Sequence, residues 1–302
     1  MHKKEDTIDF ESKPVRVVPT APDIQAPRAR TSAGRVRRRH LGIRIGVGCL
    51  LLFIVVLLGG LVANEFRTSQ YQAKFLAGVA RQLTFQMEPG PSPAIRFPET
   101  GPYDERLGYT HLPALIEKQA EKGYEIEAQA RFSPEMLKLT NQGIFPTYHE
   151  KTQAGLRILD GDERVIFEAR YPERVYKTFD SIPDLIVRTL LFIENRELLD
   201  PRYPYRNPAV EWDRLAMAAL QMVRHVVDKD QNVSGGSTLA TQMEKFRHSP
   251  EGRTSSPIDK LKQMASASLR AYLDGEETLN ARYQVILDYI NSVPLAALPD
   301  YG

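Results

Sequence analysis

Residues 235–245 read GGSTLATQMEK and combine residue types that could bind an anionic substrate. Paired glycines allow a tight turn before a helix, and a Ser or Thr can cap the free N–H groups of that helix. The N-terminus of such a helix attracts anions, phosphate above all. Thr238, Gln242 and Lys245 fall at i, i+4 and i+7, so they form one polar stripe, which is also typical of an ordinary capped amphipathic helix. The neighbouring apolar stripe consists of Leu239, Met243 and Phe246.

Glu194 is a second candidate, because it ends an apolar stretch that reads LLFIENRE. On a helix it would share a face with Val187 and Leu191. A carboxyl group on an apolar face loses hydration, which suits a general base or acid that works near neutral pH. A solvated glutamate near a helix end is the alternative interpretation of this residue.

The elements that must position these residues are mainly helical. Two apolar runs at 156–159 and 165–167 flank an Asp-Gly-Asp turn and predict a β-hairpin. Ser-Ile-Pro-Asp at 181–184 is a helix start, and a helix is expected over 184–198. Further helices are expected over 209–227, after the glycines at 235–236, over 257–273 and over 277–292.

An apolar segment of 19 uncharged residues runs from Ile45 to Ala63, long enough to cross a bilayer core as a helix. Residues 1–44 carry eleven Lys/Arg and five Asp/Glu, a net charge of +6. Basic residues flank the cytoplasmic side of membrane helices, so we expect the N-terminus in the cytoplasm and the rest outside. A cleaved signal peptide is the alternative, and nucleic-acid binding by the basic arm is disfavoured because the arm adjoins an apolar segment.

The sequence therefore predicts a mainly α protein with one transmembrane helix and a small hairpin. Its expected parts are a disordered basic tail (1–40), an anchor (41–64), an extracytoplasmic juxtamembrane and linker region (65–150) and a helical domain (151–302). The six histidines are scattered without metal-ligand spacing, which argues against a dedicated zinc site.

The order of these features resembles the peptidoglycan glycosyltransferases of glycosyltransferase family 51, the polymerising domain of bifunctional penicillin-binding proteins. The order is hairpin, Ile-Pro, Glu-containing helix, GGST helix, Lys-containing helix and Tyr-x-Asn, over residues 155–302. The resemblance implies a lysozyme-like helical lobe beside the bacterial inner membrane. It also implies polymerisation of lipid II with release of undecaprenyl pyrophosphate.

The first two motifs of that family can be carried over residue by residue. A Glu-Asp pair followed by Arg appears here as Glu194-Asn195-Arg196, and the resemblance makes Glu194 the base that deprotonates the acceptor sugar's 4-hydroxyl. In the second motif, GGSTITQQ-x-x-K, Ala240 and Thr241 depart. The resemblance implies that Thr238, Gln242 and Lys245 surround the lipid-linked pyrophosphate and that Arg196, Ser237 and Lys260 also bind the substrate.

The third and fourth motifs are more degenerate. The family's Arg-Lys-x-x-Glu is matched by residues 259–263, where Lys260 survives and Gln263 takes the place of the second catalytic Glu. A glutamine cannot carry charge on the leaving-group side, although it can donate a hydrogen bond. The fourth motif ends in Tyr289-Ile-Asn291, so Asn291 is a further implied substrate-binding residue.

The resemblance also implies partners. These are lipid II, the nascent glycan strand, the membrane and other cell-wall synthesis proteins, without nucleic acid. A divalent cation, Mg²⁺ or Mn²⁺, would be held with the substrate pyrophosphate. The family continues beyond Gly302, so the domain is expected to be incomplete at its C-terminus. Two alternatives remain: a degenerate module that binds lipid II or glycan, and a lysozyme-like hydrolase.

Overall fold

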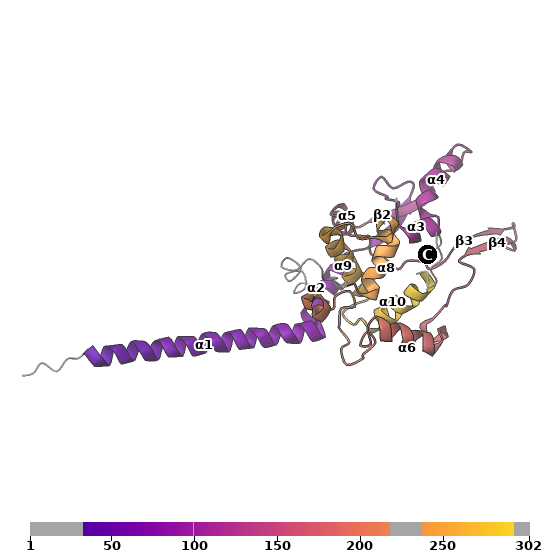
Figure 1. Ribbon diagram of the computed structural model, residues 1–302. Coiled ribbons are helices and arrows are strands. Elements are labelled where there is room, and N and C mark those ends of the chain that lie inside the picture. Colours follow the sequence, from indigo (N-terminus) through magenta and orange to yellow (C-terminus); the bar gives the residue numbers. More distant parts are fainter. Residues whose placement is uncertain (1–32, 99, 218–236, 293–302) are drawn as a thin grey trace, which may run out of the picture. The chain divides into compact units, whose positions relative to one another are not determined.

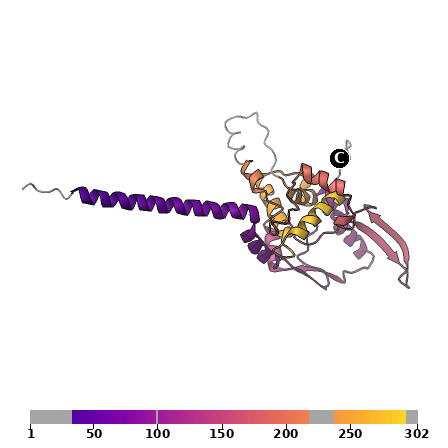
Figure 2. The same ribbon diagram turned by 90° about the horizontal axis from the view of Figure 1, so that it is seen from below.

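The computed structural model describes residues 33–98, 100–217 and 237–292 (Figures 1 and 2). The chain divides into two compact units, Met1–Leu57 and Leu58–Gly302. Helix α1 (Ala33–Thr68) contains the apolar segment predicted from the sequence. By length and composition, its part from Arg44 to Thr68 is a candidate membrane span with a mean hydropathy of 2.9.

The described part of the second unit is mainly helical, as predicted. Two small antiparallel sheets accompany the helices. One pairs β1 (Phe85–Pro89) with β2 (Ala128–Phe132), and the other pairs β3 (Ala154–Leu159) with β4 (Val165–Tyr171). The α-helices are α2 (Gln70–Ala80), α3 (Pro102–Arg106), α4 (Leu112–Ala120), α5 (Pro134–Asn141), α6 (Asp184–Ile193), α8 (Leu239–His248), α9 (Pro257–Ala271) and α10 (Leu279–Ser292). Short 3-10 helices cover Tyr109–His111, Phe179–Ser181 and Pro250–Gly252.

The predicted hairpin is present as β3 and β4, with a β-bulge between Ile158 and Leu159. It projects away from the helices (Figures 1 and 2), and all of its β4 residues are exposed. Arg157 and Glu168 face each other across the two strands and form an ion pair of 2.8 Å. The hairpin is therefore held by its own strand pairing.

Helix α1 ends where Ser69 takes a left-handed backbone conformation, with φ of 55°. The carboxylate of Glu65 accepts hydrogen bonds from the backbone N–H groups of Tyr71 and Gln72, at 3.0 and 2.9 Å, and so caps the start of α2. The chain thus turns between two helices. Small residues of α2, Ala73 and Ala77, then pack against the end of α9.

The helices around the candidate site share one apolar core. Ile182, Val187, Leu198, Leu239, Ile286 and Leu287 are buried together there. Helix α8 lies between α9 and α10 and contacts both (Figure 1). Each buried aliphatic side chain contributes about 1.5–3 kcal/mol, so this core fixes α6 and α10 against α8.

Two expected helix ranges require correction or restriction. The helix expected over 184–198 ends at Ile193 instead, because Asn195 accepts the N–H of Glu197 in a turn and Arg214 donates to the carbonyl of Glu194. Of the helix expected over 209–227, residues 212–217 are helical and 218–227 lie outside the described residues. The glycines at 235–236 also lie outside them.

Candidate active site

Glu194 lies directly after the last turn of α6, and its half-buried carboxylate contacts α8. The side-chain amide of Gln242 donates to Glu194 Oε2 at 3.0 Å. The hydroxyl of Tyr289, on α10, is 3.4 Å from the amide oxygen of Gln242. Burial raises the pKa of Tyr289, and the negative charge of Glu194 raises it further. Helices α6, α8 and α10 thus bring together three residues that the sequence motifs contain.

Glu194 lines a cavity of about 850 Å³. Residues near the end of α1 form part of the same wall, where the ring of Phe66 stacks on Trp212 at a centroid distance of 4.4 Å. The indole N–H of Trp212 is buried and finds no partner among the described residues. Arginines are the most frequent charged residues in the lining: Arg67, Arg196, Arg202, Arg206 and Arg214. The cavity therefore combines carboxylates, guanidinium groups and an apolar wall.

The carboxylates of Glu197, Asp213 and Glu211 also line this cavity. That of Glu211 contacts Asn195, the residue after Glu194. Its Oε1 accepts a hydrogen bond of 2.6 Å from the amide of Asn195, and its Oε2 lies 2.7 Å from Nε of Arg214. Arg214 also donates to the backbone carbonyl of Glu194. Burial raises the pKa of Glu211 above its ordinary value, against the opposite effect of Arg214 and Asn195.

The GGST segment enters α8 with the predicted capping geometry. Thr238 is the N-cap, and its hydroxyl accepts the backbone N–H of Thr241 at 3.2 Å. The ammonium group of Lys260, on α9, donates to the hydroxyl of Ser237. Burial lowers the pKa of Lys260, and the positive charge of Lys245 lowers it further. Positive charge of this kind favours an anionic ligand.

Two of the site residues predicted from the sequence, Gln263 and Asn291, have side chains that form hydrogen bonds within the protein. The amide of Gln263, which is only 1% exposed, donates to Ser249 at 2.8 Å and accepts from Thr254 at 3.0 Å. Asn291 bonds through both amide atoms to the backbone of Tyr176, each at 2.9 Å. Neither Gln263 nor Asn291 is among the described residues that line the cavity of Glu194.

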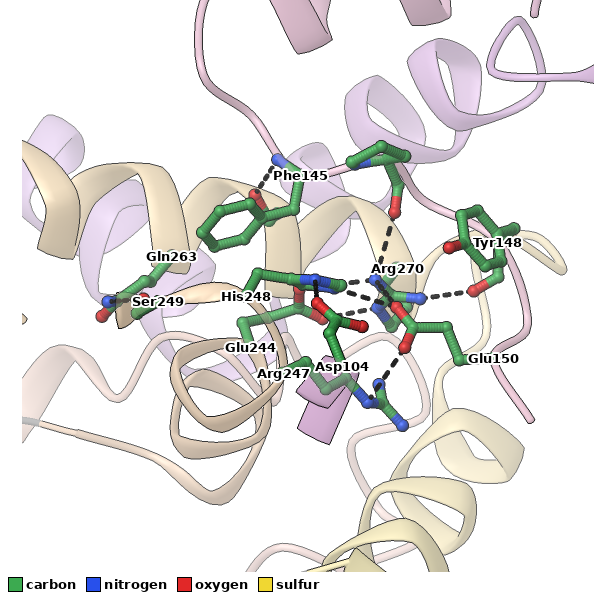
Figure 3. Close-up of polar contacts among 12 residues, drawn as sticks. Asp104, Phe145, Tyr148, Glu150, Glu244, Arg247, His248, Ser249, Gln263 and Arg270 are labelled. Atoms are coloured by element: carbon green, nitrogen blue, oxygen red, sulfur yellow. Dashed lines mark hydrogen bonds and ion pairs between the residues drawn. The ribbon is translucent and has the colours of Figure 1, made fainter. Parts of the chain in front are cut away.

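A buried ionic cluster occupies the other end of α8 (Figure 3). Its His248 lies between two carboxylates, with Nδ1 3.2 Å from Asp104 and Nε2 2.9 Å from Glu150. Because both ring nitrogens face carboxylate oxygens, the doubly protonated imidazolium satisfies the geometry. Burial by itself would lower the pKa of His248, but the charge of Glu150 and the hydrogen bond to Asp104 outweigh it and raise the pKa to about 9.

The same cluster contains two buried arginines. Arg270, on α9, contacts Glu244 and also lies 3.0 Å from Glu150. Arg247, on α8, pairs with Asp288 at 2.8 Å and so joins α8 to α10. The cluster therefore ties the segments before residue 151 to the helices that carry the candidate site.

This geometry predicts that protein stability depends on the protonation of His248. Its folded-state pKa of about 9 exceeds the unfolded value of about 6.5, so its contribution is complete below pH 6.5. That contribution is lost as the pH rises to 9, and we expect the free energy of unfolding to fall by about 2–3 kcal/mol over this range.

Urea unfolding followed by circular dichroism at a series of pH values measures this effect. His248→Gln should remove the decrease, whereas the control His149→Gln, at an exposed histidine paired with Asp274, should keep it. Identical pH profiles for the parent and His248→Gln would contradict the assignment.

Sequence reasoning missed several residues of the cavity and of the cluster. Glu211, Trp212 and Arg214 carry no motif signal. Glu150 and Asp104 belong to a stretch without recognisable pattern. The burial of Glu244 and Arg247 on one face of α8 was not predicted either, because charged residues at helical spacing usually indicate a solvated surface.

The described residues contain no group of three or more His, Cys, Asp or Glu side chains that could hold a metal ion. The expected Mg²⁺ or Mn²⁺ would thus depend on the phosphates of the substrate for most of its ligands.

Comparison with known proteins gives one match. Residues 162–299 match a family model described as Transglycosylase. No curated protein and no solved structure matches the chain. The matched range begins in the turn of the β3–β4 hairpin and includes α6, α8, α9 and α10, which carry the candidate site.

Proposed function

Residues 162–299 belong to the transglycosylase family, and on this premise we propose that the protein is a membrane-anchored peptidoglycan glycosyltransferase. It would polymerise lipid II into glycan strands and release undecaprenyl pyrophosphate. The observation that carries this proposal is the Glu194 carboxylate, held by Gln242 in a cavity that the last turns of α1 also line. A substrate with a polyprenyl tail in the membrane needs a reacting centre close to the end of the anchor.

In the proposed reaction Glu194 accepts the proton of the acceptor sugar's 4-hydroxyl. The oxygen forms a bond to the anomeric carbon of the donor from the face opposite the pyrophosphate. The bond between that carbon and the pyrophosphate oxygen breaks, and its electron pair leaves with undecaprenyl pyrophosphate. The configuration at the anomeric carbon is inverted. The hydrogen bond from Gln242 orients the Glu194 carboxylate for this proton transfer.

Cationic groups would balance the charge that develops on the leaving pyrophosphate. Lys260 donates to Ser237 beside the N-terminus of α8, whose free N–H groups add a positive partial charge, and Lys245 lies in the last turn of the same helix. Arg196 lines the cavity itself, with its guanidinium 4.0 Å from the ring centroid of Phe192. A divalent cation bound together with the substrate pyrophosphate would add to this charge balance.

The orientation of the chain in the membrane follows from the same proposal. The basic tail would lie in the cytoplasm, and the domain after α1 would lie outside, where lipid II is polymerised. The nascent glycan strand would be the second substrate, and other cell-wall synthesis proteins are expected partners. The likeness to penicillin-binding proteins and to lysozyme remains a prediction from the motifs.

The test is polymerisation of fluorescently labelled lipid II by the detergent-solubilised chain, with strands separated by gel electrophoresis. The proposal is supported if glycan strands form and one undecaprenyl pyrophosphate is released for each glycosidic bond. Saturable binding of lipid II without strands would favour the alternative of a binding module, for which Gln263 in place of a second acid is the motivating observation. New reducing ends released from finished peptidoglycan would indicate a hydrolase instead.

A further inference from the structure

Position 195 is where the chain departs from the Glu-Asp pair of the motif it resembles, and in the structure the amide of this residue faces a carboxylate. The amide nitrogen of Asn195 donates to Glu211 Oε1 at 2.6 Å. Glu211 belongs to a segment without any motif, sixteen residues further along the chain. A carboxylate is therefore present beside position 195, although it comes from another residue.

Two sets of contacts link Glu211 to Glu194. The first is the hydrogen bond of Glu211 with Asn195, which follows Glu194 in the chain. The second involves Arg214, which pairs with Glu211 at 2.7 Å and donates to the backbone carbonyl of Glu194. Both sets of contacts lie at the end of α6, where Glu194 lines the cavity.

The charges explain why an amide at position 195 is favourable. The side chain of Glu211 is 13% exposed, so a second carboxyl group in contact with it would either repel it as a carboxylate or have to retain a proton. An aspartate at 195 would place two negative charges at hydrogen-bond distance, which is strongly unfavourable in a partly buried site. An asparagine in the same position donates a hydrogen bond instead. The amide at 195 and the carboxylate at 211 therefore complement each other.

We propose that Glu211 is a positioning residue of the candidate active site, which fixes Glu194 through Asn195 and Arg214. This inference rests on the proposed function, because it assumes that the cavity of Glu194 is the reacting site. Glu211 forms no bond to the substrate in this scheme. It holds the turn after α6, so that the Glu194 carboxylate stays aligned with Gln242 and with the acceptor hydroxyl.

An exchange of the two side chains tests the pairing. Asn195→Asp alone should lower kcat for lipid II polymerisation by about 30-fold, and Glu211→Gln alone by about tenfold, with smaller changes in KM. The double variant restores one carboxylate and one amide in contact, and we expect its kcat within about threefold of the parent. Asp184→Asn, an exposed partner of Arg188 on α6, is the control for removal of a carboxylate.

The single tryptophan provides a readout that does not need activity. Trp212 follows Glu211 in the chain and lines the same cavity, so its fluorescence should follow the ionisation of that carboxyl. The charged groups that act on Glu211 are Arg214, Arg206 and Glu194. We expect a titration with a midpoint above the ordinary value of a glutamate. It should disappear in Glu211→Gln, remain in Glu194→Gln, and move up by about one pH unit in Asn195→Asp.

The outcomes separate the two proposals. Rescue by the double variant, together with the shift of the fluorescence titration, supports the positioning role. If the parent polymerises lipid II and Asn195→Asp does so equally well, the inference is wrong and the proposed function stands. If the parent is inactive under all conditions, the proposed function fails. The pairing is then judged by fluorescence, and an unshifted midpoint in Asn195→Asp would overturn it. Circular dichroism of each variant confirms that it is folded.

Discussion

Replacing Glu194 by Gln is expected to reduce the rate of glycan-strand formation by a factor of about 10²–10⁴, the usual contribution of a general base. The substitution preserves the size of the side chain and its contact with Gln242, but the amide cannot accept the proton of the acceptor hydroxyl. Binding of lipid II should change little, because the cationic groups beside α8 and in the cavity are untouched. The loss should therefore appear in kcat rather than in KM.

The measurement compares initial rates on labelled lipid II for the parent, Glu194→Gln and Asp184→Asn. The last variant removes an exposed carboxylate from the first turn of the same helix and should polymerise at the parent rate. A Glu194→Gln enzyme as fast as the parent would show that another group takes the proton. Loss of both lipid II binding and turnover would instead indicate that the cavity had been disturbed.

Removing the guanidinium of Arg270 is expected to produce the largest loss of stability. Its partners Glu244 and Glu150 are 1% and 3% exposed, so Arg270→Met would leave buried carboxylates with too little compensating charge. Breaking a buried ion pair in this way costs about 3–5 kcal/mol of unfolding free energy. Thermal and urea unfolding, followed by circular dichroism in detergent, measure the change.

Arg253→Met is the matched control, because Arg253 and Glu251 form an ion pair that is 80% and 77% exposed. That change should stay within about 0.5 kcal/mol of the parent. Adding Glu244→Gln to Arg270→Met should recover part of the loss, since one of the uncompensated charges disappears. An unchanged stability for Arg270→Met would mean that solvent reaches the cluster and screens it.

The part of the fold that follows from short-range chemistry was predictable. Thr238 caps α8 because a hydroxyl before a helix can accept the free N–H groups, and this contact involves residues three positions apart. The apolar helix at 45–63 and the turn between β3 and β4 are likewise encoded in consecutive residues. The apolar side of α8 was also predicted correctly for Leu239 and Met243, which are 3% and 2% exposed.

The end of α6 was not predicted correctly from the sequence. The apolar pattern continues to Leu198, yet the helix stops at Ile193, because Arg214 and Asn195 take the backbone groups that another turn would need. Helix propensity could not reveal a partner twenty residues away. The burial of Glu150 could not be predicted either, since it depends on Arg270, which lies 120 residues further along the chain.

The sequence by itself determined the capped start of α8 and the apolar helix, and it singled out Glu194 as the candidate base, because each depends on residue types at fixed short spacing. Only the tertiary structure decided that Glu194 accepts a hydrogen bond from Gln242 and that the amide of Gln263 is hydrogen-bonded to Ser249 and Thr254. It also decided that the carboxylate of Glu211 lines the cavity of Glu194. The physical reason is that the burial of a charge, and the partner that compensates it, are set by the packing of distant segments.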